Sequence, residues 1–325
     1  MVLESLIGEK NIRQKPVLIF FLTLIISIES IIFANALFPA HASVLSVAFI
    51  TIGLVPIVHN ILAKEEYDEA LQRKSATTFF ARHFNVIMIY VWIFVAIIFA
   101  FSITYAFVPN EQKDVVFEEQ INAFCAIAGS ENCNGGIPIS IAGRATAGAF
   151  GACQNPSTKN IAACSFFIFE NNVGVLIFVI VLSLLYGAGA IFIIAWNASI
   201  LGLFFGEMFL SSQHVTGIGL LQGMLIGHGP PELLSYIFGA LAGAILSAMI
   251  SRGQFLSHEF STIIKDVSFL VFLAIFSVIY GAIVEAIGIL GFGELYFVLG
   301  FVYVLTVLVM VLFYGKKDKI INAIN

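Results

Sequence analysis

The chain has 325 residues, of which 60% are hydrophobic and only 11% charged, and its formal net charge is −5. Soluble domains carry about 25% charged residues, so this composition excludes a soluble cytosolic enzyme. The sequence has no basic patch, no collagen-like glycine period and too little polarity for a disordered chain. It therefore predicts an all-α polytopic membrane protein whose first partner is the lipid bilayer, and which binds no nucleic acid.

A helix needs about 20 apolar residues to cross a bilayer. Seven stretches meet this requirement: Pro16–Phe38, Ala42–Leu62, Asn85–Val108, Val173–Trp196, Leu233–Ile250, Val267–Leu290 and Leu295–Phe313. An eighth segment, Ala198–Ile226, is apolar but is interrupted by the polar residues 211–214. Because each of its halves is too short to cross alone, we expect about eight spans, one of them a broken helix. The first stretch lacks the pattern of a cleaved signal and is expected to remain as a span.

Positive charges decide how the broken segment is counted. With eight crossings and a cytoplasmic N-terminus, 12 of the 15 lysine and arginine residues lie inside and 3 lie outside. If the segment instead dips in and returns, the later loops invert and the division becomes 7 inside and 8 outside. The positive-inside rule favours the first arrangement. We therefore expect a multi-pass protein of the cell membrane with both termini in the cytoplasm.

This topology divides the chain into three regions. Residues 1–108 form a three-span region with a cytoplasmic loop at residues 63–83, residues 109–164 form an external loop, and residues 165–325 form a second membrane domain with a cytoplasmic tail. The external loop contains all four cysteines, which are Cys125, Cys133, Cys153 and Cys164. Cysteines confined to one external loop predict two disulfides, with three possible pairings. A zinc site is the alternative, although the loop has no C-x-x-C pair and no histidine.

Polar residues concentrate in the run from residue 170 to residue 250. Asn171 and Asn172 lie at the expected outer start of one span, and Asn197 follows its expected end. Gly202 and Glu207 lie in the first half of the broken segment. Ionisable and amide groups are costly in hydrocarbon and tend to face other helices or a cavity, so this run contains the candidate functional residues.

Two pairs of glycines in the same run are each spaced by one helical turn. Gly202 pairs with Gly206, and Gly239 pairs with Gly243. Small residues at this spacing let two helices approach closely, so each pair predicts a packing face.

The sequence GHGPPELL predicts the start of a helix. Pro230 and Pro231 lack the N–H groups that a first helical turn does not use. Glu232 then falls in the first turn, where its charge meets the free N–H groups and the positive end of the helix dipole. His228 lies just before this start, and we expect its ring to interact with the Glu232 carboxylate.

The segments NNVGV, WNASILGLFFGEM and GHGPPELLSYIFGALAG resemble the membrane domain of the stage II sporulation protein M family over about residues 165–310. The matching positions are Asn171, Asn172, Asn197, Gly202, His228, Gly229, Glu232 and Gly239. The resemblance implies an integral membrane protein of a family widespread in bacteria and archaea. Its sporulation member acts as a scaffold in a complex with a cell-wall hydrolase. The two prolines in the HG-x-x-E box and the cysteine-bearing loop depart from the family pattern.

These features favour a non-catalytic membrane scaffold or a permease-like component of unknown substrate, which works with other membrane proteins or as a homo-oligomer. One alternative is a transporter or channel with its site at the broken helix, lined by Asn197, Glu207 and Gln222.

A metal-dependent intramembrane enzyme is the other alternative. His228 and Glu232 are spaced as two metal ligands, and Glu207, His214 or Glu285 are candidates for the third ligand that catalytic zinc needs. The sequence has no G-x-x-x-x-G-K-[ST], H-E-x-x-H or G-x-S-x-G motif. We therefore assign no catalytic residues and predict no cofactor, with zinc at His228 and Glu232 as the open alternative.

Overall fold

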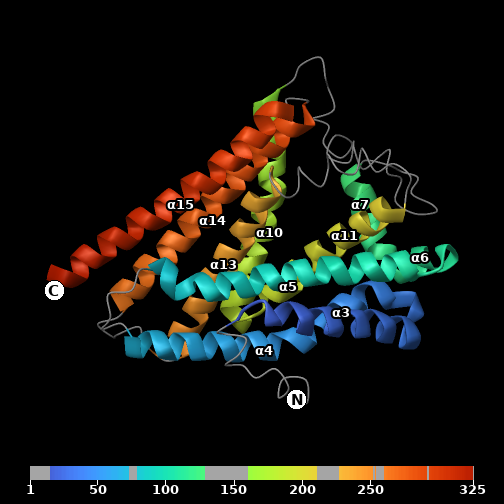
Figure 1. Ribbon diagram of the computed structural model, residues 1–325, viewed down its shortest axis with the longest axis horizontal. Coiled ribbons are helices and arrows are strands. Elements are labelled where there is room, and N and C mark those ends of the chain that lie inside the picture. Colours follow the sequence, from blue (N-terminus) through green and yellow to red (C-terminus); the bar gives the residue numbers. More distant parts are fainter. Residues whose placement is uncertain are drawn as a thin grey trace.

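The computed structural model describes residues 15–72, 79–128, 160–210, 227–251, 253, 260–290 and 293–324 (Figure 1). Over these ranges the chain consists of helices and turns, without a strand. The helices are α3 (Leu18–Leu37), η1 (Pro39–His41), α4 (Ala42–Gln72), α5 (Phe79–Phe107), α6 (Asn110–Val116), α7 (Glu118–Ala128), α10 (Ile161–Tyr186), α11 (Ala190–Leu210), α13 (Gly229–Ser251), α14 (Phe260–Ile289) and α15 (Gly293–Ile324). The predicted all-α fold is confirmed.

The apolar helices are those of a polytopic membrane protein. In the part of the chain that the structure describes, seven helices are long and apolar enough to cross a membrane, namely α3, α4, α5, α10, α11, α13 and α14. A shorter apolar stretch, Leu295–Val311, lies within α15. The multi-pass membrane character is confirmed, whereas the count of eight and the cytoplasmic termini stay predictions.

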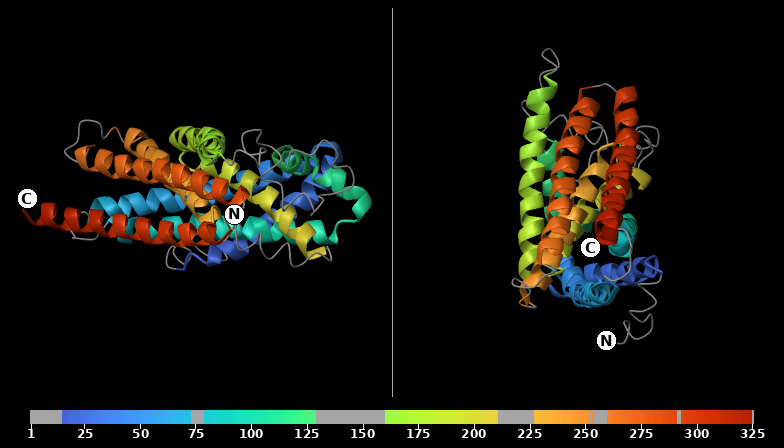
Figure 2. Two further views of the ribbon diagram at one scale, coloured as in Figure 1. Left: turned by 90° about the horizontal axis from the view of Figure 1, so that it is seen from above. Right: turned by 90° about the vertical axis from the view of Figure 1, so that its left-hand side faces the viewer.

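The long helices form two bundles that run in different directions (Figures 1 and 2). In the first bundle, α3 packs against α4 and α5, and α11 packs against α5 and α4. In the second bundle, α10, α13 and α14 pack against one another, and α15 packs along α14. The short helices α6 and α7 lie against α4, and α7 also contacts α11. Thus α11, from the C-terminal half of the chain, completes the bundle of the first three long helices.

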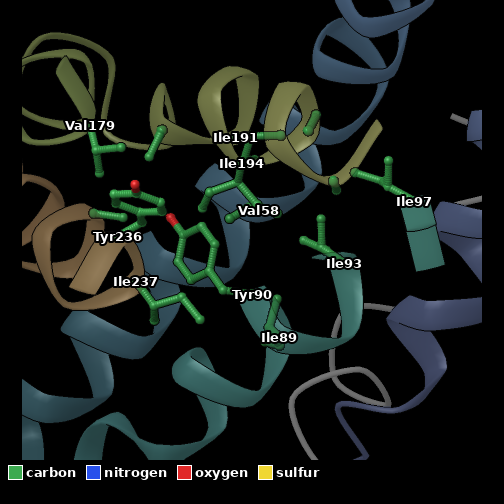
Figure 3. Close-up of a cluster of buried hydrophobic side chains, with 14 of the residues drawn as sticks. Val58, Ile89, Tyr90, Ile93, Ile97, Val179, Ile191, Ile194, Tyr236 and Ile237 are labelled. Atoms are coloured by element: carbon green, nitrogen blue, oxygen red, sulfur yellow. The ribbon is translucent and has the colours of Figure 1, made fainter. Parts of the chain in front are cut away.

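Apolar side chains fill the region where the two bundles meet (Figure 3). They come from α4, α5, α10, α11 and α13, and they include Val58, Ile93, Val179, Ile194 and Ile237, each at most 1% exposed. Burial of such side chains contributes roughly 1.5–3 kcal/mol each for water-to-apolar transfer, but in lipid the main gain is close packing. This junction therefore fixes α10 and α13, which carry the candidate site, against the first bundle.

Both predicted glycine faces are packing faces. A Cβ atom on Gly202 would lie 2.5 Å from Cβ of Phe101, and one on Gly206 would lie 3.0 Å from the carbonyl oxygen of Ser102. On α13, a Cβ atom on Gly243 would lie 2.6 Å from the carbonyl oxygen of Ile180 in α10. The Ser102 hydroxyl also donates to the carbonyl oxygen of Gly202, at 2.8 Å. The glycines thus hold α11 against α5 and α13 against α10.

One predicted span boundary is wrong. The sequence suggested a span over Val173–Trp196, but α10 begins at Ile161 and ends at Tyr186, and α11 starts at Ala190. Gly187 adopts a φ of 67° between them, a conformation that favours glycine. Hydropathy alone does not detect this turn because the flanking residues are uniformly apolar. Trp196 and Asn197 consequently lie inside α11.

Three other predictions rest partly or wholly on residues outside the described ranges. Residues 198–210 continue α11 without interruption, while residues 211–226 lie outside, so the broken helix stays a prediction. The predicted cytoplasmic loop at residues 63–83 begins within α4, which continues to Gln72. Cys133 and Cys153 lie outside the described ranges, Cys125 falls in α7, and Cys164 is buried in the first turn of α10. The disulfides therefore stay predictions, as does the three-region division.

Candidate functional site

The predicted helix start at GHGPPE is confirmed. Helix α13 begins at Gly229, with Pro230, Pro231 and Glu232 in its first turn. The N–H of Glu232 donates to the carbonyl oxygen of His228 at 3.2 Å, which closes the turn. The first turn therefore places His228 and Glu232 beside each other at the start of α13.

Three ionisable side chains converge at this helix start. His228, Glu232 and Glu285 each offer a ligand atom, and these atoms all lie within 4.8 Å of one another. Glu285 comes from α14, and its carboxyl group lies beside that of Glu232. Of the three candidates for a third ligand, the structure thus places Glu285 beside the pair. His214 lies outside the described residues.

An asparagine from α10 holds the Glu232 carboxylate. The side-chain amide of Asn172 donates to Oε1 of Glu232 at 2.9 Å. Oδ1 of Asn172 accepts from the Tyr236 hydroxyl at 3.4 Å and from the Asn171 amide at 3.3 Å. Hydrogen bonds of this kind fix the orientation of an amide that has a donor end and an acceptor end. Asn171 and Asn172, predicted as candidates, therefore lie at the same place as the HG-x-x-E box.

A tyrosine from α15 holds the imidazole of His228. The Tyr296 hydroxyl lies 2.5 Å from Nδ1 of His228 and accepts from the His228 backbone N–H at 3.4 Å. Cβ atoms on Gly227 and Gly288 would lie 2.1 Å and 2.9 Å from carbon atoms of the Tyr296 ring. The tyrosine ring therefore reaches His228 only because both positions are glycine.

We call the group formed by Asn172, His228, Glu232, Glu285 and Tyr296 the polar centre. It lies where α13 and α15 begin and α14 ends, so it is near one end of the second bundle (Figure 1). Gly281 on α14 faces Glu232, because a Cβ atom there would lie 3.2 Å from Cγ of Glu232. Helices α13 and α14 thus approach closely enough for two carboxyl groups to meet.

The structure does not bring the other predicted residues to the polar centre. The Asn197 amide donates within α11 to the carbonyl oxygen of Ile193, at 2.8 Å. Glu207 accepts a hydrogen bond from the Tyr105 hydroxyl at 2.8 Å, in the first bundle. Gly202 packs on α5, as described above. The transporter site expected from Asn197, Glu207 and Gln222 is therefore not assembled among the described residues, and Gln222 lies outside them.

Sequence reasoning assigned no role to Tyr236 or Tyr296. Tyr296 lies in no recognisable motif, and Tyr236 is not among the positions singled out in the GHGPPELLSYIFGALAG segment. Aromatic residues are frequent throughout this chain, with 33 phenylalanines and 9 tyrosines. Glu285 was noticed as a polar residue inside a span, but its partner depends on how α14 packs. Two features of the sequence could have pointed to these residues. They are the Glu285 carboxylate near the end of an apolar helix, and the glycines, Gly227 and Gly288, that face Tyr296.

Comparison with known protein families agrees with the motif reading. The family described as Stage II sporulation protein M matches residues 91–288. The chain belongs to this family. The family match begins within α5 and ends near the end of α14, so it starts well before residue 165, where the motif resemblance began. It includes Asn172, His228, Glu232 and Glu285, whereas Tyr296 lies beyond it. No curated protein and no solved structure matches the chain.

Proposed function

We propose that this member of the stage II sporulation protein M family is a permease-like membrane protein whose polar centre binds and releases a proton or a cation. The observation that carries the proposal is the approach of the Glu232 and Glu285 carboxyl oxygens to within 4.8 Å, in helices that have the length and composition of membrane spans. Two carboxyl groups at this separation can share one proton or bind one cation. Ionisable side chains within membrane-spanning helices are rare and commonly mark ion or substrate sites, so a carboxyl pair near the ends of two such helices is expected to serve a function.

A purely structural role is less well supported by the same geometry. Helix packing in the second bundle is already provided by glycines such as Gly243, which bring α13 against α10. By contrast, the polar centre collects ionisable groups from α13 and α14 and adds polar partners from α10 and α15. A scaffold does not need such a concentration of groups that bind ions. The Tyr105–Glu207 and Ser102–Gly202 hydrogen bonds in the first bundle are ordinary interhelical contacts.

The three ionisable groups also favour a second candidate function, a metal-dependent intramembrane enzyme. Catalytic zinc sites use three protein ligands and leave a position for water or substrate, and Glu285 supplies the third ligand that His228 and Glu232 lacked. The two candidate functions differ in one measurable respect, because only a permease moves an ion across the membrane.

Transport in reconstituted vesicles tests the proposal. The purified protein would be placed in liposomes that contain a pH-sensitive or a Zn²⁺-sensitive dye, and a potassium diffusion potential would drive the ion inward. We expect a change in dye signal faster than in protein-free vesicles, reduced to the protein-free rate by Glu232→Gln and by Glu285→Gln. Glu207→Gln is the matched control, because it removes a carboxylate from α11, outside the polar centre. Signals equal to those of protein-free vesicles for both ions would contradict the proposal.

A further inference from the structure

We infer that His228, Glu232 and Glu285 form a binding site for one divalent transition-metal ion of the Zn²⁺ type. This inference rests on the proposed function, since it names the class of cation that the polar centre binds. It goes beyond that function in giving the ligands and the residues that orient them.

The spacing of the three side chains suits one metal ion. Zinc bonds to nitrogen and oxygen are about 2.0–2.2 Å long, so ligand atoms around one zinc ion are roughly 3.3–3.6 Å apart. The three candidate atoms already lie within 4.8 Å of one another. The remaining difference of about 1.2–1.5 Å is of the size that carboxylate side-chain rotations cover, so the inferred site needs no large change in the packing of α13 on α14.

The ligand types select the class of metal. An imidazole together with two carboxylates suits zinc, manganese, iron or cobalt, whereas calcium and magnesium prefer sites made only of oxygen atoms. Two carboxylates also balance the charge of a divalent ion. Three protein ligands leave at least one coordination position for water, so the ion can enter and leave.

Two of the three ligands are oriented by neighbours as metal ligands usually are. A histidine that binds a metal commonly engages its other ring nitrogen in a hydrogen bond, and bound carboxylates are hydrogen-bonded in turn. The Tyr296 hydroxyl occupies Nδ1 of His228, which leaves Nε2 for the metal. The Asn172 amide donates to Oε1 of Glu232, which leaves Oε2 free of that bond. These partners come from α15 and α10, so all four helices of the second bundle contribute to the site.

A buried hydroxyl lies on the same face of α13 as Glu232. Ser235 is fully buried and its hydroxyl oxygen has no hydrogen-bond partner. Ser235 and Tyr236 follow Glu232 by three and four residues, so they share its helix face, and Tyr236 reaches the polar centre through Asn172. Other buried hydroxyls of the described residues, such as Ser183 on α10 and Ser27 on α3, also lack a partner, so the Ser235 hydroxyl fits a metal-bound water without requiring one.

The polar centre lies at the less buried end of α13. His228, Gly229 and Pro230 are partly exposed, while the α13 residues from Ser235 to Gly243 are buried. We therefore place the entry of the ion on the side at which α13 begins.

Metal titration of the purified full-length protein tests this inference. The protein would be stripped with a chelator and titrated with Zn²⁺ against a fluorescent competitor, and with Co²⁺, whose absorption spectrum reports the coordination geometry. We expect one Zn²⁺ per chain and a Co²⁺ spectrum typical of nitrogen and oxygen ligands. His228→Ala, Glu232→Gln and Glu285→Gln should each weaken binding by about 100-fold or more, and Tyr296→Phe and Asn172→Ala by about 10–100-fold. Glu207→Gln should bind like the wild type.

Tyr296→Phe is expected to fold normally, because it keeps the ring that packs on Gly227 and Gly288 and removes only the hydroxyl. Weaker metal binding by this variant would therefore not be due to misfolding. The inference is overturned if stripped wild-type protein binds less than one Zn²⁺ per two chains, or if His228→Ala binds as tightly as Glu207→Gln. Proton flux that depends on Glu232 without Zn²⁺ binding would overturn this site but support the proposed function. Stoichiometric Zn²⁺ binding without flux of either ion would support the site and contradict the proposed function.

Discussion

At the scale of single residues, the polar centre depends on side chains that come from four different helices. His228 and Glu232 are neighbours because they flank the first turn of α13. Their partners Asn172, Glu285 and Tyr296 come from three other helices. Each ionisable group therefore has a partner that only the folded bundle supplies, and removing one partner leaves another polar group unsatisfied.

This dependence predicts that His228 and Glu232 behave as one unit. Their ligand atoms lie within 4.8 Å of each other, and side chains this close in one polar network typically couple by about 0.5–3 kcal/mol in unfolding free energy. His228→Ala combined with Glu232→Gln should therefore cost less than the sum of the two single variants. Unfolding of all three variants in detergent measures this coupling. Losses that simply add would show that the two residues act separately.

Gly227 gives a second prediction at this scale. A Cβ atom there would lie 2.1 Å from the Tyr296 ring, so Gly227→Ala forces the ring away from His228 and should destabilise the protein by about 1–3 kcal/mol. Gly174→Ala is the control, because nothing lies within 4 Å of a Cβ atom at that position of α10. There the change should be neutral or stabilising by up to about 1 kcal/mol. Equal thermal shifts for the two variants would refute the close contact.

At the scale of helices, glycines determine which elements touch. Gly202 brings α11 against α5, and Gly243 brings α13 against α10. Helices in lipid gain little from the hydrophobic effect against one another, so close backbone approach and interhelical hydrogen bonds hold them together. The Ser102 hydroxyl bond to the carbonyl oxygen of Gly202 is such a contact.

Gly202→Ala tests the packing of α11 on α5. The new methyl group would lie 2.5 Å from Cβ of Phe101 and 2.8 Å from the carbonyl oxygen of Ile98. Because two of the nearest atoms belong to the backbone of α5 or are fixed to it, the helices must separate, and we expect a loss of about 1–3 kcal/mol. Thermal unfolding in detergent measures the loss. A variant as stable as Gly174→Ala would contradict this interface.

The sequence allowed the helices to be predicted better than their ends and their neighbours. Long apolar stretches predicted where the apolar helices lie, apart from the division between α10 and α11, because a helix satisfies its own backbone hydrogen bonds in hydrocarbon. The boundary at Trp196 was wrong because the turn at Gly187 leaves no trace in hydropathy. The HG-x-x-E box placed His228 and Glu232 correctly, since the first turn of a helix is a local feature. Glu285 and Tyr296 could not be assigned, because their positions depend on how α14 and α15 rotate and pack.

At the scale of the whole molecule, the chain consists of two bundles joined at an apolar junction (Figure 3). In the first bundle the Glu207 carboxylate accepts from the Tyr105 hydroxyl, whereas the second bundle contains the polar centre. The family match extends over both bundles, from α5 to α14. We therefore expect the second bundle to bind the ion, and the first bundle to stabilise the second through the apolar junction.

The predicted topology can be tested on the same scale. Single cysteines placed at Glu65 and at Gly253 should react with a membrane-impermeant label from the same, cytoplasmic side, because the distribution of Lys and Arg favours eight crossings. A cysteine at Asn110 should react from the opposite side. Labelling of Glu65 and Gly253 positions from opposite sides would contradict the eight-crossing arrangement.

The central claim is that the Glu232 and Glu285 carboxyl groups of the polar centre bind and release an ion that the protein moves across the membrane. Its most direct test is the rate at which vesicles that contain Glu232→Gln change their internal pH or Zn²⁺ level, compared with vesicles that contain Glu207→Gln. The account predicts a rate equal to that of protein-free vesicles for Glu232→Gln and the wild-type rate for Glu207→Gln. Equal rates for the two variants would contradict it.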